Sequence, residues 1–257
     1  MLLDCARDGQ RSLCVWGAGP CNDLQLDLLC RAFRQVVLVD LDGDTVRQGL
    51  ACQARDGFDQ LSVAAPIDLS GILSLLGQYR EDPSPTLADR IRQQAGDCRI
   101  EELGQFDVVV STCLFSQIVD SVRGALGEGN PLLFDLLPVL RQRHLELLVE
   151  HANAGGRAIL VTDVTSSDAL QEMTRPDADL PDLLRNQVCT GNHFHGLNPL
   201  VIDQSIRTSR IVAERVGTLR VSSPWLWDAV ARQYLCLAYM MELKPEAAVA
   251  AGSRSSG

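Results

Sequence analysis

Two glycines and one aspartate are the residues whose types and spacing most clearly indicate a binding site in this chain. Gly17 and Gly19 directly follow a short apolar run, and Asp40 ends the next apolar run, roughly twenty residues later. Glycines at such a turn let the backbone approach a ligand, and a carboxylate at the end of the next strand can accept hydrogen bonds from both hydroxyls of a ribose. The spacing indicates a nucleotide or nucleoside site. The alternative is a tight strand-helix turn in which Asp40 only caps the following helix.

The charge around this turn favours one kind of ligand. A dinucleotide site would have a small residue three positions after Gly19, where this chain has Asn22. Its helix N-terminus would also face a pyrophosphate, but this chain has the negatively charged Asp23 in the first turn of the expected helix. No basic residue occurs between Gly17 and Arg31. A carboxylate beside a phosphate is unfavourable, whereas S-adenosylmethionine carries positive charge and no phosphate. We therefore expect S-adenosylmethionine as the cofactor, with an NAD(P)-dependent oxidoreductase as the alternative.

The composition excludes several classes of protein. The net charge is −10, which would repel a phosphate backbone, so we expect no nucleic-acid partner. Lys244 is the only lysine, and it lies beside a Pro/Ala/Gly/Ser-rich end, which argues against a P-loop or a Schiff-base enzyme. The nine cysteines form no C-x-x-C pair, so neither a disulfide framework nor a zinc ribbon is indicated. The sequence has no apolar stretch long enough to span a membrane, and its first residues lack the pattern of a secretory signal. We therefore expect a cytoplasmic protein with no membrane partner.

Short apolar runs alternate with longer segments of helical period, which predicts a doubly wound α/β fold whose mainly parallel sheet has helices on both faces. We expect one domain over residues 1–243 and a disordered tail over 244–257. Two late strands, 218–221 and 234–241, should form an antiparallel hairpin at one edge. The other expected strands cover 12–16, 36–39, 61–65, 106–110 and 157–162, and the expected helices cover 23–33, 45–54, 72–79, 87–94, 136–153 and 200–216.

Four segments, in order, resemble successive motifs of the class I S-adenosylmethionine-dependent methyltransferases: VWGAGP at 15–20, VVLVDLD at 36–42, GQFDVVV at 104–110 and GGRAILV at 155–161. The resemblance covers roughly residues 12–163. It implies a Rossmann-like, seven-stranded sheet with an antiparallel last strand, and methyl transfer from S-adenosylmethionine. The chain departs from the pattern at Cys21, where the family often has a third glycine, so a non-catalytic binding or scaffold protein with this fold is a further alternative.

The resemblance also implies roles for individual residues. The glycine turn and Asp40 would hold the methionine end and the ribose, and Leu41 would pack on the adenine. Asp68 would face the adenine amino group, although a helix cap explains Asp68 equally well. The residues so implied are Gly17, Ala18, Gly19, Asp40, Leu41 and Asp68, with Ser111, Thr112 and Gln117 facing donor and acceptor unless they form an ordinary polar loop.

The methyl acceptor is less well defined. Methyl transfer needs a base only when the acceptor must lose a proton, and the candidates for that base are Asp163, His193 and His195. The two histidines lack a nearby carboxylate cluster, so we expect no metal. Trp225 and Trp227 either wall an acceptor pocket or anchor the late hairpin. An Asn/Asp-Pro-Pro-aromatic run after the fourth strand, typical of adenine and amide methylation, is absent, which favours a small-molecule acceptor and leaves its reacting atom open.

Overall fold

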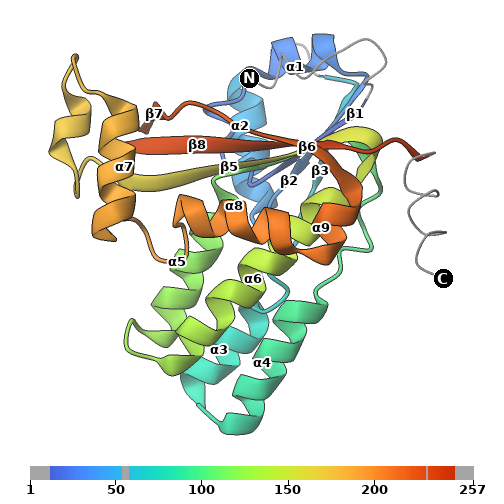
Figure 1. Cartoon of the computed structure of the whole chain (residues 1–257). Coiled ribbons are helices and arrows are strands. Elements are labelled where there is room, and N and C mark those ends of the chain that lie inside the picture. The colour runs from blue at the N-terminus through green and yellow to red at the C-terminus, as the bar shows by residue number, and fades with distance from the viewer. Residues whose placement is uncertain (1–11, 54–57, 230, 247–257) are drawn as a thin grey trace, which may run out of the picture.

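The computed structural model describes residues 12–53, 58–229 and 231–246. The start of the chain, expected to lack a secretory signal, lies outside these residues, as does the expected tail from residue 247 on. Within the described part, eight strands form one sheet in the order β3-β2-β1-β4-β5-β8-β6, with β7 also paired to β8 (Figure 1). The strands are β1 (Ser12–Trp16), β2 (Gln35–Val39), β3 (Leu61–Ala64), β4 (Phe106–Thr112), β5 (Ala152–Ser166), β6 (Val216–Val221), β7 (Trp225–Ala229) and β8 (Arg232–Leu243).

The central strands are apolar almost throughout because helices cover both of their faces. In β1 and β2 the last four residues are buried, and β1 pairs in parallel with β2 on one side and β4 on the other. The chain order reverses between β1 and β4, and such a reversal opens a crevice at the carboxyl ends of the strands. This arrangement confirms the expected doubly wound α/β fold.

The antiparallel edge differs from the expected hairpin in one respect. β8 runs antiparallel to β5, and β6 and β7 pair with successive stretches of the opposite edge of β8, at residues 239–243 and 232–236. Residues 222–224, Ser-Ser-Pro, separate the two short strands, because proline has no N–H to donate to the ladder. The expected seven-stranded sheet therefore has eight strands, since its edge strand is divided in two.

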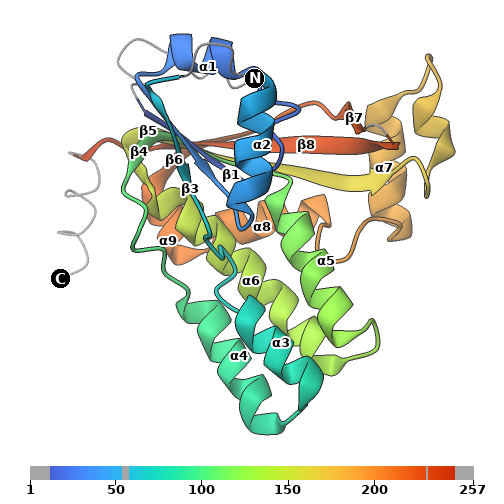
Figure 2. The same cartoon turned by 180° about the vertical axis from the view of Figure 1, so that it is seen from behind.

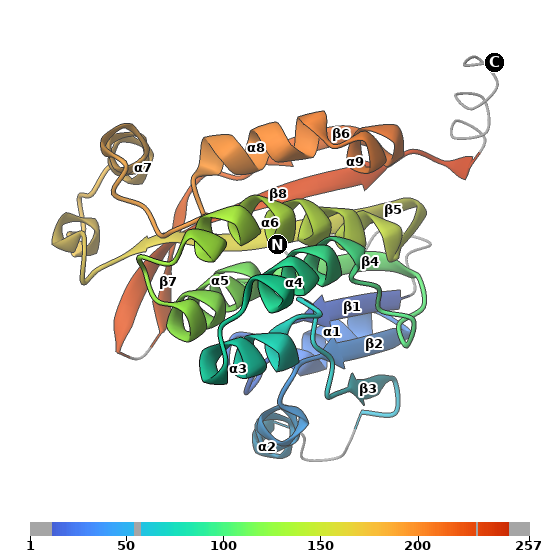
Figure 3. The same ribbon diagram turned by 90° about the horizontal axis from the view of Figure 1, so that it is seen from below.

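The helices form two unequal layers (Figures 2 and 3). One face of the sheet packs on α1 (Leu26–Ala32) and α2 (Gly43–Gln53). The other face has the larger core, and α7 (Leu180–Thr190) packs against a small cluster at the far end of β8. The helices of the larger core are α3 (Leu73–Glu81), α4 (Pro85–Asp97), α5 (Leu114–Leu126), α6 (Pro131–Glu150), α8 (Pro199–Thr208) and α9 (Arg210–Arg215). No helix among the described residues is long and apolar enough to cross a membrane.

Several element bounds differ from the sequence prediction. α1 starts at residue 26 rather than 23 because residues 21–25 form a loop, and α5 and α7 were not predicted. α6 begins at Pro131 and ends at Glu150, since β5 already starts two residues later. The single helix expected over 200–216 is two helices, because Ser209 ends α8 and its side chain caps α9. Lys244 is not part of a free tail, since its Nζ donates hydrogen bonds to the backbone carbonyls at the end of α9.

Candidate functional site

The turn after β1 has the open backbone that its glycines predict. Gly17 and Gly19 have φ angles of 73° and 50°, in the left-handed region that glycine adopts at low cost. The N–H groups of Gly17 and Ala18 donate to the carbonyl oxygen of Val39, which ties the turn to the end of β2. A Cβ atom on Gly19 would meet nothing within 4 Å, so the turn borders open space. Cys21, at the position where the resembled family often has a third glycine, has a glycine-like φ of 56°.

Asp40 lies against this turn and is not the cap of the next helix. Its Oδ2 accepts a hydrogen bond of 2.8 Å from the Gly19 N–H, and its Oδ1 accepts one of 3.0 Å from the Asp42 N–H. Asp42 is the residue that caps α2, because its carboxylate accepts the N–H groups of Asp44 and Thr45. The helix-cap alternative for Asp40 is therefore wrong. Asp42 therefore caps the helix, and Asp40 contacts the turn.

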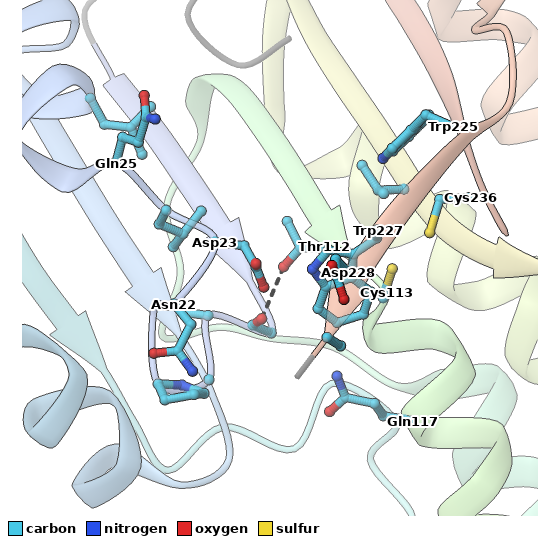
Figure 4. Close-up of a pocket in the computed structure, with 18 of the residues that line it drawn as sticks. Asn22, Asp23, Gln25, Thr112, Cys113, Gln117, Trp225, Trp227, Asp228 and Cys236 are labelled. Atoms are coloured by element: carbon cyan, nitrogen blue, oxygen red, sulfur yellow. Dashed lines mark hydrogen bonds between the residues drawn. The ribbon is translucent and has the colours of Figure 1, made fainter. Parts of the chain in front are cut away.

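A cavity of about 650 Å³ opens beside the turn (Figure 4). Gly17, Ala18 and Gly19 form one side of it, and Thr112 and Gln117 border it from the end of β4 and the start of α5. The Thr112 hydroxyl is 2.9 Å from the carbonyl oxygen of Gly17, a hydrogen bond that joins the two sides. The volume falls within the range of about 300 to 1,000 Å³ that is usual for small-molecule sites.

The opposite wall of the cavity comes from β7. Trp225 and Trp227 alternate on this strand, and the ring of Trp227 stacks on Tyr234 at a centroid distance of 5.3 Å. Asp228 also lines the cavity and is exposed (Figure 4). The sequence left the two tryptophans open between hairpin anchors and pocket wall. The two tryptophans anchor β7 to the core, and because β7 forms this wall they also line the cavity.

Two thiols border the cavity, Cys113 just after β4 and Cys236 within β8. A hydrogen bond with Cys236 and burial raise the pKa of the Cys113 thiol, so this group stays protonated at neutral pH. Asp163 pairs with Cys236 across β5 and β8, yet it is not among the lining residues. Burial raises the pKa of the Asp163 carboxyl, and its Oδ1 has no hydrogen-bond partner among the described residues. Asp163 therefore lies behind the wall of the cavity rather than in it.

Ser111 is the clearest wrong prediction for this site. Successive residues of a strand point to opposite faces, so Thr112 reaches the cavity and Ser111 points into the larger core. Ser111 is fully buried, with its Oγ 2.9 Å from Nε2 of His144. Burial lowers the pKa of His144 to about 4, which keeps its ring neutral. Ser111 belongs to the core and faces neither donor nor acceptor.

The remaining predicted residues lie outside the lining of this cavity. Asp68 acts as a local cap, since its carboxylate accepts hydrogen bonds from Ser70 and from the backbone N–H of Leu73 at the start of α3. Leu41 is 51% exposed beside Asp40, so its role toward adenine stays a prediction. His193 and His195 follow α7 and do not line the cavity. Among the described residues no group of three His, Cys, Asp or Glu side chains could hold a metal ion.

Sequence reasoning missed Asp228, Cys113 and Cys236 as cavity residues. For Asp228 a signal was present, because Trp225 and Trp227 already alternate with the period of a strand. For the two cysteines no signal was present. Each lies in an apolar or mixed run that is indistinguishable from an ordinary core segment.

No protein-family model matches this sequence, and no curated protein matches it either. Among solved structures, the chain is similar to a candidate methyltransferase from Bacillus halodurans, with 11% identity over 95% of this chain and 96% of the other and a TM-score of 0.49. The N-methyltransferase NodS from Bradyrhizobium japonicum, in complex with S-adenosyl-L-homocysteine, is 10% identical over 95% and 83%, with a TM-score of 0.46. An rRNA methylase from Streptococcus thermophilus is 12% identical over 95% of both chains, with a TM-score of 0.42. Likenesses at this level do not identify a donor or an acceptor for this chain.

Proposed function

We propose that this protein is a methyltransferase that binds S-adenosylmethionine at the turn formed by residues 17–20 and methylates a small molecule in the adjoining cavity. One observation carries the proposal. The cavity is built on the glycine turn, Asp23 and Asp228 border it, and its described lining contains no lysine, arginine or histidine. A site of this charge suits a cationic ligand without phosphate and disfavours a pyrophosphate.

The residues around the turn fit such a ligand. The open space at Gly19 leaves room for a bound group against the backbone. The Asp40 carboxylate uses two of its roughly four acceptor positions for backbone N–H groups, which leaves capacity for ribose hydroxyls. Leu41 presents an exposed apolar side chain next to Asp40, where an adenine ring would cover it. Asp23, in the loop between the turn and α1, would pair with the ammonium group.

When bound, S-adenosylmethionine supplies a methyl group on a positively charged sulfur that needs no further activation. The protein then has to align the two reactants and exclude water, and alignment of this kind is worth roughly 7 to 11 kcal/mol in favourable systems. Thr112 holds the turn against the end of β4, and Gln117 offers an amide from α5. Asp163 does not line the cavity, so we assign it no proton transfer.

A small acceptor is favoured over a nucleic acid for two reasons. The cavity, about 650 Å³ and lined partly by β7, has the size of a small-molecule site. A net charge of −10 and a lining without basic residues both oppose a phosphate backbone. The cytoplasmic location expected from the sequence stays a prediction.

Titration calorimetry with S-adenosylhomocysteine and with NADH tests the proposal. We expect heat from S-adenosylhomocysteine only, and a loss of about 1 to 3 kcal/mol of binding free energy in Asp40→Ala, because charged hydrogen bonds are removed. Asp40→Asn, which keeps an acceptor for the Gly19 N–H, separates ligand contact from turn geometry. Asp97→Ala on α4 is the matched control, since Asp97 is exposed and far from the cavity in the fold.

Two outcomes would count against the proposal. Binding of NADH without binding of S-adenosylhomocysteine would favour the oxidoreductase. Binding of S-adenosylhomocysteine without transfer of a labelled methyl group into any fraction of a metabolite extract would favour the non-catalytic alternative.

A further inference from the structure

We infer that the part of the cavity beneath β7 selects an amine with a flat aromatic ring, held as an ammonium cation by Trp225, Trp227 and Asp228. This inference rests on the proposed function for the amine's role as methyl acceptor. In that role the ammonium group first gives one proton to the Asp228 carboxylate, the nitrogen lone pair then bonds to the methyl carbon, and the carbon–sulfur bond breaks with S-adenosylhomocysteine as the leaving group. The recognition of the amine rests on the cavity itself. We call these three residues the β7 face.

The β7 face lies apart from the donor residues. Asp40 and Leu41, which would hold the adenosine end of the donor, do not line the cavity, whereas the glycine turn does. The cavity therefore has to accommodate only the methionine end of the donor. The volume on the side of β7 is left for a second molecule.

The chemistry of the β7 face favours a positive charge. Indole rings are the strongest cation–π acceptors among side chains, and two of them alternate on one short strand. Asp228 is the next residue after Trp227, and alternation along β7 turns its side chain away from the two rings, but it also lines the cavity near the end of the strand (Figure 4). Arg232, which pairs with Ala229 across β7 and β8, forms an ion pair with Asp168 at 3.1 Å and lies 5.9 Å from the ring centroid of Tyr234. No basic side chain in the described lining competes for the Asp228 carboxylate.

The same face also favours a flat molecule with a polar edge. Trp227 is held in place by its stack on Tyr234, so its position is fixed before a ligand arrives. Its indole Nε1 is buried and has no hydrogen-bond partner among the described residues, which leaves a donor without an acceptor. Val161 and the protonated thiol of Cys113 supply neutral surface nearby. Two carboxylates, Asp23 at the turn and Asp228 on β7, offer one counter-charge to each of two cationic ligands.

Paired probes of nearly equal shape and opposite charge test the inference. Tryptamine and indole-3-propionate are titrated calorimetrically into the full-length protein, with and without saturating S-adenosylhomocysteine. We expect tryptamine to bind at least about tenfold more tightly, because its ammonium group gains a charge pair with Asp228 and cation–π contacts with the indole rings. Asp228→Asn should reduce that preference to about threefold or less, and Trp225→Leu should weaken tryptamine by roughly 2- to 30-fold. Asp97→Asn on α4 is the matched control.

Each result either supports or overturns the inference. Equal affinity for the two probes, tighter binding of indole-3-propionate, or no binding of either probe at millimolar concentration would overturn it. So would a preference for tryptamine that survives Asp228→Asn. The affinity of each variant for S-adenosylhomocysteine is measured first, to check that the glycine turn at residues 17–20 is intact. If the wild type binds no S-adenosylhomocysteine, the proposed function fails, and the titrations without it still decide whether the β7 face selects cations.

Discussion

Acidification should destabilise this protein through one buried histidine. His144 on α6 is 3% exposed, and burial lowers its pKa from 6.5 to about 4. Its Nε2 contacts the Ser111 hydroxyl, and its Nδ1 has no partner among the described residues, so a second proton on the ring would be buried without an acceptor. Between pH 6.5 and pH 4 the His144 ring is protonated in the unfolded chain but stays neutral in the folded chain. Stability from this ring is therefore complete above pH 6.5 and declines as the pH falls toward 4.

The size of the effect follows from the two pKa values. One pKa unit corresponds to about 1.4 kcal/mol, so the full loss is on the order of 3 kcal/mol and roughly 2 kcal/mol of it is reached by pH 5. That is a large fraction of the 5 to 15 kcal/mol that usually stabilises a folded domain. Asp163 acts in the opposite direction, because burial raises its pKa and its contribution to stability grows as the pH falls. A comparison of wild type with a His144 variant cancels Asp163 and every other group.

Urea unfolding at pH 7.5 and pH 5.0, followed by tryptophan fluorescence, measures the difference. Between these pH values the wild type should lose about 2 kcal/mol more free energy of unfolding than His144→Gln, which keeps a hydrogen-bonding group toward Ser111, or His144→Leu, which does not. His195→Gln is the matched control, because His195 is exposed to water in the folded state. Equal pH dependence of wild type and both His144 variants would refute the reasoning, since the buried ring would then be protonated as easily as a free one.

Two further predictions concern the turn and the thiols. A Cβ atom on Gly49 of α2 would overlap the backbone carbonyl of Pro20, so Gly49→Ala should cost roughly 1 to 3 kcal/mol of stability and weaken the binding of S-adenosylhomocysteine. Gly77 on α3 has open space around it, so Gly77→Ala should increase stability by up to about 1 kcal/mol. Thermal unfolding and titration calorimetry measure both effects. Iodoacetamide at mild alkaline pH should alkylate the exposed Cys52 well before the buried, protonated Cys113, as followed by peptide mass spectrometry, and equal rates would contradict the assigned burial.

The geometry of the glycine turn depends on local backbone. The positions of Gly17, Gly19 and Asp40 follow from the order of strand, turn and strand, and their role toward a ligand stays a prediction. Even the glycine-like φ of Cys21 occurs where the resemblance places a glycine. The parallel strands were predicted because strands buried on both faces read as continuous apolar runs.

The parts that were missed depend on contacts between distant segments. Ser111 and Thr112 are neighbours of similar polarity, and only the pleat of β4 decides which of them reaches the cavity. β7 was missed because it pairs only with β8, and a five-residue strand between turns has too short a pattern to identify alone.

The pairing of β7 has a practical meaning for engineering. Because this strand bonds to a single neighbour and lies at the rim of the sheet, it can be exchanged as a short cassette without rebuilding the parallel core. On the proposed function, the segment 225–229 would set which molecules are methylated, and residues 17–20 and 40 would hold the donor. On the proposed function, libraries at positions 228 and 229, which keep the packed Trp225, Leu226 and Trp227, should alter substrate range and leave thermal stability and donor affinity near those of the parent protein.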